Sequence, residues 1–303
     1  MASPAESVAF IGLGVMGYGM AVNLRTKLDR NTTMYICDVS EAAIERFKDE
    51  VGSRGPIEVV KNGAEAAEAA DTLFSMLPDG PAVKSVYLDE TTGVLAGVRK
   101  AAASSPINKL IVECGTIENA TILEVAKASI DTEKALPGGS VLDFVDAPVS
   151  GGPNGATGGT LAFMVGTDRP DTAFDRVQSY LKYMGRPDSI FLCGGIGAGV
   201  SFKIINNYIS AVASLASSEA LNIGVKLGLD PKRLTDVINA SGGQTWITSN
   251  INPPELRRRF PYRTVQEGPR EYVPINAANA PSAMLTNAQW VASSQSRPMH
   301  EQY

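Results

Sequence analysis

The stretch GLGVMG, residues 12–17, constrains the fold more than any other part of this 303-residue sequence. It follows the short apolar run VAFI, and the apolar residues after it recur at helical spacing, which predicts a strand, a tight turn and a helix. Glycines permit the backbone to turn sharply and let another group approach it closely. The spacing G-x-G-x-x-G alone is a weak signal, since any glycine-rich turn can produce it, so the surrounding pattern has to decide its meaning.

The same alternation of strand and helix continues along the chain and predicts an α/β fold. Apolar runs that end in turn residues alternate with helical patterns, which favours a mostly parallel, doubly wound sheet. After Gly195 the strand signal stops, and we predict a long helix over residues 198–227 and a second helix started by Asp230 and Pro231. We therefore predict a Rossmann-type domain over residues 1–195, an all-helical domain over 196–252, and an irregular tail over 253–303.

Composition excludes several classes of function. The formal net charge of −5 provides no basic surface for nucleic acid or for an anionic membrane. The three cysteines are far apart, which favours buried thiols over disulfides or a metal cluster, and the single histidine, His300, makes a zinc site or a histidine-based triad improbable. The segment MASPAES before the first strand is too short for a targeting peptide, so a cytoplasmic location is expected.

An acidic residue strengthens the interpretation of the glycine loop as a dinucleotide site. Asp38 ends the second predicted strand, 21 residues after Gly17, where a carboxylate accepts hydrogen bonds from the adenosine ribose. In such a site Gly12 permits the tight turn, Gly14 lets the pyrophosphate approach the backbone, and Gly17 allows the helix to pack closely. Asp38 would repel a 2′-phosphate, and no arginine follows it until Arg46, so NAD is favoured over NADP.

Two further stretches contain candidate substrate residues. In DAPVSGGPNGATGGTLAFMVG, residues 146–166, Ser150 is followed by Gly151 and Gly152, and this hydroxyl with unshielded N–H groups suits a small carboxylate. In the long run of residues 197–228, Lys203 and Asn207 are four apart and share one helix face. That run is interrupted by charges and is too polar for a membrane span, so a buried helix is predicted, with its apolar face formed by Ile204, Ile205, Ile209, Val212 and Leu215.

Three motifs in this order and spacing, GLGVMG, DAPVSGGPNGATGGTLAFMVG and GAGVSFKIINN, resemble the β-hydroxyacid dehydrogenase family over residues 7–252. The resemblance implies NAD-dependent oxidation of a small hydroxy acid, with 3-hydroxyisobutyrate of valine catabolism as the first candidate. It also implies that Lys203 is the catalytic acid/base, that Asn207 positions the substrate and that Ser150, Gly151 and Gly152 bind its carboxylate. The implied cofactor-binding residues are Gly12, Leu13, Gly14, Val15, Met16, Gly17, Asp38, Leu77, Pro78 and Thr116.

The chemistry of the lysine agrees with that implied role. Oxidation of an alcohol by hydride transfer needs a base for the hydroxyl proton, and a desolvated lysine is a credible one because burial disfavours its charged form. The plainer alternative is a lysine that extends its charged end to water from the start of a helix.

Several alternatives stay open at this point. The same motifs serve reductases of tartronate semialdehyde, glyoxylate or succinic semialdehyde. A 6-phosphogluconate dehydrogenase carries a histidine where Asn206 stands, which makes it a poorer match. The last 50 or so residues depart from the family, and a catalytically impaired dinucleotide-binding product is therefore a further alternative. Family members also occur in mitochondria and as homo-oligomers, so both are compatible with the resemblance.

Overall fold

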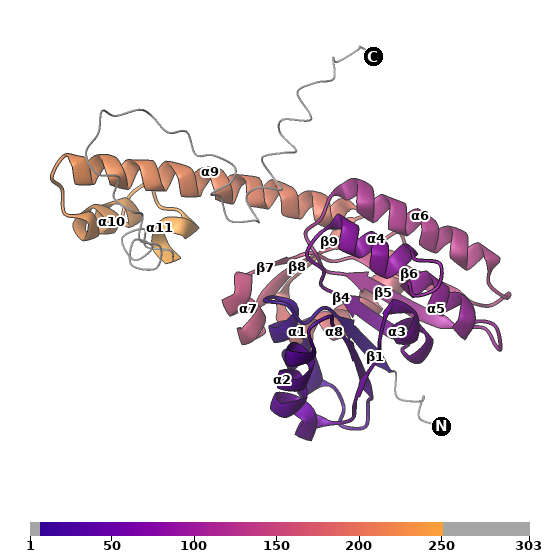
Figure 1. Cartoon of the computed structure of the whole chain (residues 1–303). Coiled ribbons are helices and arrows are strands. Elements are labelled where there is room, and N and C mark those ends of the chain that lie inside the picture. The colour runs from indigo at the N-terminus through magenta and orange to yellow at the C-terminus, as the bar shows by residue number, and fades with distance from the viewer. Residues whose placement is uncertain (1–6, 251–303) are drawn as a thin grey trace, which may run out of the picture. The chain divides into compact units, whose positions relative to one another are not determined.

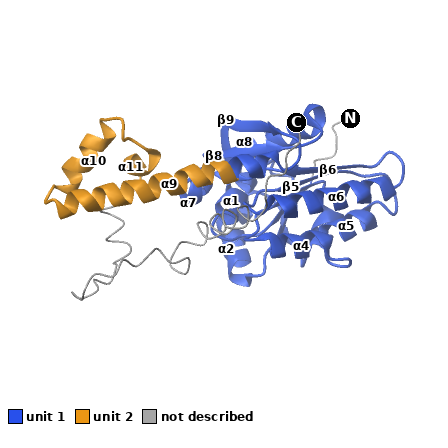
Figure 2. Cartoon of the chain, turned by 90° about the horizontal axis from the view of Figure 1, so that it is seen from above, with its two compact units in different colours: residues 1–203 blue, residues 204–303 orange. Residues whose placement is uncertain are grey.

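The structure, a computed structural model, describes residues 7–250 of the chain. The chain divides into two compact units, residues 1–203 and 204–303 (Figure 2). The division lies inside helix α9 (Ala198–Lys226), after the first six residues of that helix. The domain boundaries predicted near residue 195 and near residue 252 stay a prediction, and the predicted tail, 253–303, lies outside the described residues.

Unit 1 is built on a nine-stranded sheet with strand order β3-β2-β1-β4-β5-β6-β8-β7, and β9 pairs with β8. The pairs from β3 to β6 are all parallel, whereas β8 runs antiparallel to β6 and β7 and parallel to β9. This confirms the mostly parallel, doubly wound sheet. The strands are β1 (Val8–Ile11), β2 (Met34–Cys37), β3 (Ile57–Val59), β4 (Thr72–Ser75), β5 (Asn108–Glu113), β6 (Val141–Asp146), β7 (Val149–Ser150), β8 (Leu161–Gly166) and β9 (Gly185–Gly194).

Helices cover both faces of this sheet (Figure 1). Helices α3, α4, α5 and α6 gather on one side, and α1, α2 and α8 lie on the other. The helices of unit 1 that precede α9 are α1 (Gly17–Lys27), α2 (Glu41–Val51), α3 (Gly63–Ala69), α4 (Gly80–Leu88), α5 (Val94–Ala101), α6 (Asn119–Ala135), α7 (Gly152–Gly158) and α8 (Asp175–Met184), with short turns η1 (Gly52–Arg54) and η2 (Pro170–Phe174).

The central strands are buried because both faces of a parallel sheet are covered by helices. Every residue of β1 and of β4 is buried, and the rings of Phe10 and Phe74 on these two neighbouring strands stack with centroids 6.4 Å apart. The strand predicted over the apolar run VAFI is therefore confirmed. The edge strand β3 has no counterpart in the prediction, since its three residues are half-buried or exposed and give only a weak apolar pattern.

Helix starts follow the local capping rules. The side chain of Ser40 accepts a hydrogen bond from the N–H of Ala43 at the start of α2, and Asp79 caps α4 in the same way. In unit 2, Asp230 caps α10 (Pro231–Asn239) by accepting from the N–H of Arg233. Such caps satisfy backbone donors that have no partner inside the helix, and each typically stabilises a protein by about 1 kcal/mol.

Unit 2 contains most of α9, together with α10 and the short α11 (Trp246–Asn250). The long helix is confirmed within one residue of its predicted end, but the prediction that its apolar face is buried is wrong. The exposed fraction is 62% for Ile205 and Ile209, and Val212 and Leu215 are also exposed. The apolar period predicts a helix, but burial depends on which other segments cover that helix. With α10 and α11 in place, these four side chains remain exposed.

Two further predictions concern the cysteines and membrane-spanning helices. Cys37, Cys114 and Cys193 are all free thiols, and the first two are buried, as predicted. Among the helices of residues 7–250, none is both long enough and apolar enough to cross a membrane.

The core of unit 1 can be tested by replacing phenylalanine with alanine at a buried position and at an exposed position. We expect Phe10→Ala to lower the free energy of unfolding by about 3–5 kcal/mol, because Phe10 is fully buried and its loss leaves a cavity. Phe191→Ala makes the same change on a side chain that is 52% exposed, and should lower it by less than about 1 kcal/mol. Urea unfolding followed by circular dichroism gives both values, and equal losses would contradict this description of the core.

Candidate functional site

The glycine loop lies at the carboxyl edge of the sheet, between β1 and α1. Gly12 has φ +96°, and a Cβ there would stand 2.4 Å from the carbonyl oxygen of Met76. A Cβ at Gly17 would stand 2.0 Å from the carbonyl oxygen of Gly12, so packing requires glycine at both positions. At Gly14, by contrast, none of the described residues has a heavy atom within 4 Å of the Cβ position. The second glycine is therefore free of packing demands and leaves room for a ligand against the backbone.

The structure brings Asp38 to this loop. Its carboxylate accepts a hydrogen bond from the N–H of Leu13 at 2.5 Å and a second from the N–H of Ser40 at 2.7 Å. The side chain is half-buried, so part of it stays open to a ligand. The acidic residue and the glycine loop thus form one arrangement, as the sequence predicted. Of the remaining loop residues, Val15 is 78% exposed and Met16 is half-buried.

The loops after β4 and β5 lie next to the glycine loop. Leu77 follows β4, and its side chain would be 3.6 Å from a Cβ at Gly12, while its carbonyl oxygen would be 3.0 Å from a Cβ at Gly115. Pro78 is exposed and Thr116 is half-buried. Three of the predicted cofactor segments therefore converge at the carboxyl edge, which is where ligands bind in doubly wound folds.

A buried hydrogen-bond network, which the sequence analysis did not predict, supports these two loops. The carboxylate of Glu113 accepts from the hydroxyl of Ser75 and, at 2.7 Å, from the N–H of Gly115. The hydroxyl of Ser75 also lies 2.5 Å from that of Tyr87. Burial raises the pKa of Glu113 to about 7. This network connects the end of β4 to the loop that contains Thr116.

The loop predicted to bind the substrate carboxylate begins where β7 ends, at Ser150. The side chain of Ser150 is half-buried, and Gly151 and Gly152 have φ values of +137° and +61°, a conformation that favours glycine. Helix α7, which follows this loop, packs against α1. The side-chain amide of Asn23 on α1 donates to the carbonyl oxygens of Ala156 at 2.9 Å and Thr157 at 3.0 Å.

That packing joins the substrate loop to the cofactor loop. A Cβ at Gly19 would meet the backbone of Ala156 at 2.8 Å, so α1 and α7 touch through their backbones. Since α1 begins directly after the glycine loop and α7 begins at Gly152, both predicted binding loops belong to one packed body within unit 1.

Lys203 lies on the part of α9 that belongs to unit 1. Its side chain is only 8% exposed, and burial lowers the pKa of its ammonium to about 8. An amine with this pKa is partly neutral near physiological pH and can accept a proton. Asn207 is half-buried and lies on the same helix, four residues further on.

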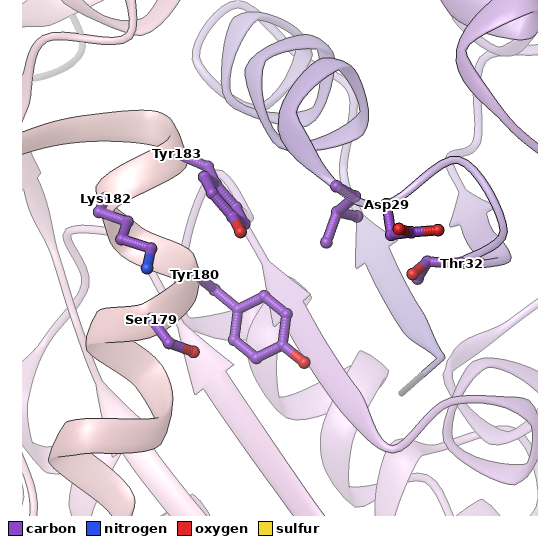
Figure 3. Close-up of a pocket in the computed structure, with 7 residues that line it drawn as sticks. Asp29, Thr32, Ser179, Tyr180, Lys182 and Tyr183 are labelled. Carbon is purple, nitrogen blue, oxygen red and sulfur yellow. The ribbon is translucent and has the colours of Figure 1, made fainter. Parts of the chain in front are cut away.

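A hollow in unit 1 lies outside this arrangement. It has a volume of about 250 Å³ and is lined by Leu28, Asp29, Thr32, Ser179, Tyr180, Lys182 and Tyr183 (Figure 3). Thr32 precedes β2, so the hollow lies at the amino edge of the parallel strands, opposite the edge that the glycine loop follows. Within residues 7–250 there is also no group of three or more His, Cys, Asp or Glu side chains that could hold a metal ion.

Comparison with known proteins places this geometry in a family. Residues 7–195 match the profile described as the NAD binding domain of 6-phosphogluconate dehydrogenase. Residues 197–265 match the profile described as NAD-binding of NADP-dependent 3-hydroxyisobutyrate dehydrogenase. The second match continues beyond residue 252, at which the resemblance carried by the three sequence motifs ends.

Individual relatives agree with these profiles. The chain is 35% identical to a probable mitochondrial 3-hydroxyisobutyrate dehydrogenase of Dictyostelium discoideum, over 83% of this chain and 70% of that protein. It is 33% identical to an NAD-dependent L-serine dehydrogenase of Pseudomonas aeruginosa, over 82% and 74%. Among solved structures, a 3-hydroxyisobutyrate dehydrogenase of Mycobacterium tuberculosis with L-serine has a TM-score of 0.69 at 28% identity, over 97% of this chain and 89% of that one.

The contribution of Asp38 to dinucleotide binding can be measured directly. Asp38→Asn keeps the size of the side chain and removes its charge, so the hydrogen bonds to the loop and to a ribose are no longer charge-assisted. We expect the Kd for NADH to rise about tenfold, and the preference for NADH over NADPH to shrink. Titration of the nicotinamide fluorescence measures both.

Asp49→Asn, an exposed position on the neighbouring helix α2, is the matched control and should leave both constants unchanged. An unaltered Kd in Asp38→Asn would remove Asp38 from the binding site.

Proposed function

The chain belongs to the β-hydroxyacid dehydrogenase family of oxidoreductases, and on that premise we propose that it oxidises 3-hydroxyisobutyrate to methylmalonate semialdehyde with NAD, a step of valine catabolism. The observation that carries this proposal is the burial of Lys203, which lowers the pKa of its ammonium to about 8. A lysine is ordinarily protonated at neutral pH, and in that form it cannot act as a general base. Burial disfavours the charged ammonium, so the neutral amine becomes available to accept a proton.

Each candidate residue has a separate task in this reaction. The hydroxyl of Ser150 and the backbone N–H groups of Gly151 and Gly152 bind the substrate carboxylate, for which their unshielded donors are suited. Asn207 orients the substrate without adding charge. The glycine loop and Asp38 hold the dinucleotide, whose nicotinamide accepts a hydride when it is bound.

The proton and the hydride leave the substrate for different acceptors. Neutral Lys203 takes the proton of the substrate hydroxyl, so that the oxygen can form the carbonyl bond as the hydride leaves the adjacent carbon. The products are the aldehyde, the reduced dinucleotide and the lysine ammonium, which then loses its proton to water. In the reverse direction the ammonium donates that proton to the carbonyl oxygen.

L-Serine is a second candidate substrate. It shares the hydroxymethyl group and the carboxylate of 3-hydroxyisobutyrate and differs by an ammonium in place of a methyl group. The names of the Pseudomonas aeruginosa and Mycobacterium tuberculosis relatives favour it. Because the reactive groups are the same, Lys203 and Ser150 would have the same tasks with either substrate.

The remaining proposals concern other substrates, a loss of turnover, and the assembly and location of the chain. Reduction of tartronate semialdehyde, glyoxylate or succinic semialdehyde would use the same groups in reverse. A product that binds dinucleotide without turnover is the alternative that the divergent C-terminal sequence raises. We also propose a homo-oligomer in the cytoplasm or in mitochondria, and one relative that is named as mitochondrial favours the second location.

Removal of the proposed base tests the chemistry. We expect Lys203→Ala to lower kcat for NAD-dependent oxidation of 3-hydroxyisobutyrate by about 10²–10⁴-fold, because general base catalysis contributes factors of that size. The Kd for NADH should stay the same. Lys182→Ala, an exposed lysine at the hollow on the opposite edge, is the control and should keep full activity. Turnover that survives in Lys203→Ala would rule out this assignment.

The pH dependence of the two directions should mirror the ionisation of Lys203. Oxidation needs the neutral amine, so kcat/KM for the alcohol should rise with pH and level off above about 8. Reduction needs the ammonium, so kcat/KM for the aldehyde should fall over the same interval. Steady-state rates in both directions between pH 6 and pH 10 would check this. Profiles that rise and fall near the ordinary lysine pKa of 10.5 would mean that Lys203 is not desolvated in the working enzyme.

A further inference from the structure

The first turn of α9, which leads to Lys203, is held by a carboxylate from a distant strand. Asp146 ends β6 and is fully buried. One of its oxygens accepts from the N–H of Gly197 at 2.7 Å, and the other accepts from the N–H of Val200 at 2.9 Å. Both oxygens of the Asp146 carboxylate therefore accept hydrogen bonds from the backbone at the start of α9, the helix that contains Lys203.

A second side chain holds the same turn from another element. Asn119, the first residue of α6, donates from its amide to the carbonyl oxygen of Gly197 and to the hydroxyl of Ser201, each at 2.8 Å. We refer to Asp146 and Asn119 together as the α9 clamp. All of these residues, and Lys203, lie in unit 1.

Backbone packing leaves the clamped turn little room to move. A Cβ at Gly199 would stand 2.2 Å from the carbonyl oxygen of Met164 and 2.8 Å from the carboxylate of Asp146. Met164 lies on β8, the strand that pairs with β7 and brings Ala162 opposite Ser150. Lys203 comes four residues after Gly199, about 6 Å along the helix axis.

Asp146 also begins the loop that leads to the proposed carboxylate site. Ser150 follows it by four residues, so one buried side chain lies at the junction of the lysine helix and the substrate loop. An ordinary helix cap is supplied by the residue just before the helix. Asp146 is instead 51 residues away from Gly197 in sequence, and it fixes α9 to the sheet.

We propose that Asp146 and Asn119 are positioning residues for Lys203, which hold the first turn of α9 so that the lysine amine lies at a fixed depth beside the Ser150 loop. This inference rests on the proposed role of Lys203 as base and names the groups that set its place. The effect is geometric, since burial lowers the pKa of Lys203 and no charged partner among residues 7–250 contributes to the shift.

Substitutions can weaken the clamp from either side. Asp146→Asn keeps the shape but replaces one acceptor oxygen with an NH₂ group that faces a backbone N–H. Asn119→Ala removes the second contact from a half-buried position and is the milder change. Asp143→Asn is the matched control, because Asp143 is a buried aspartate on the same strand that pairs with Arg169 at 2.9 Å rather than with α9.

The experiment measures the reactivity of Lys203 and the kinetics in the full-length chain. Competitive labelling with acetic anhydride between pH 7 and pH 11, read by peptide mass spectrometry, gives the titration midpoint of Lys203, with exposed Lys127 as the internal reference. We expect this midpoint, near 8 in the parent chain, to move up toward 10.5 in both clamp variants and to stay in place in Asp143→Asn. We also expect kcat to fall about 10²-fold in Asp146→Asn and about tenfold in Asn119→Ala, with KM little changed, since small displacements of a reacting group cost factors of this size.

The outcomes separate this inference from the proposed function. An unchanged midpoint in both clamp variants, or an equal shift in Asp143→Asn, would overturn the positioning role. If Asp146→Asn does not fold by circular dichroism, Asn119→Ala decides the question alone. If the parent chain oxidises no hydroxy acid but the midpoint still moves in the clamp variants, the proposed function fails while the positioning role stands.

Discussion

The parallel direction of β1, β2, β4, β5 and β6 is the constraint on which the candidate site depends. Parallel strands end at one edge of a sheet, so each loop that follows a strand reaches the same region. The glycine loop, Asp38, Leu77 and Thr116 all follow such strands, and close backbone contacts at Gly12 and Gly115 bring three of these loops together. After β6 the pattern changes, because β7 and β8 pair antiparallel, and this reversal places Ser150 at the side of the sheet where α9 begins.

Three ionisable side chains of this region are buried and therefore shielded from water. Burial raises the pKa of the carboxyl groups of Glu113 and Asp146 and lowers that of the Lys203 ammonium, so all three shift toward their neutral forms. The carboxylates have backbone N–H donors that favour their charged form, namely Gly115 for Glu113 and Gly197 and Val200 for Asp146. For the amine, burial lowers the pKa. We therefore propose structural tasks for the two acids and a proton-transfer task for the lysine.

Local sequence pattern predicted much of this, and the limits of the prediction are physical. Strand and helix periodicity, the spacing from Gly17 to Asp38, and the caps at Ser40 and Asp230 are short-range signals, and the structure agrees with each of them. Burial of the apolar face of α9 could not be inferred from its period, because exposure depends on segments far away in sequence. The Ser75–Glu113 network and the Asp146 contacts were missed for the same reason, although Asp146 stands at the start of a motif that the sequence singled out.

We propose that Lys203 titrates below an ordinary lysine and is therefore a base at physiological pH. The most direct test is a ¹³C/¹⁵N NMR titration of the lysine side chains in the ligand-free protein, with Lys203→Arg used to assign the Lys203 signal. We expect a pKa of about 8 for that one resonance, below the ordinary lysine value of 10.5. A Lys203 resonance that titrates together with the exposed lysines would contradict it, because the amine would then be charged throughout the working pH range.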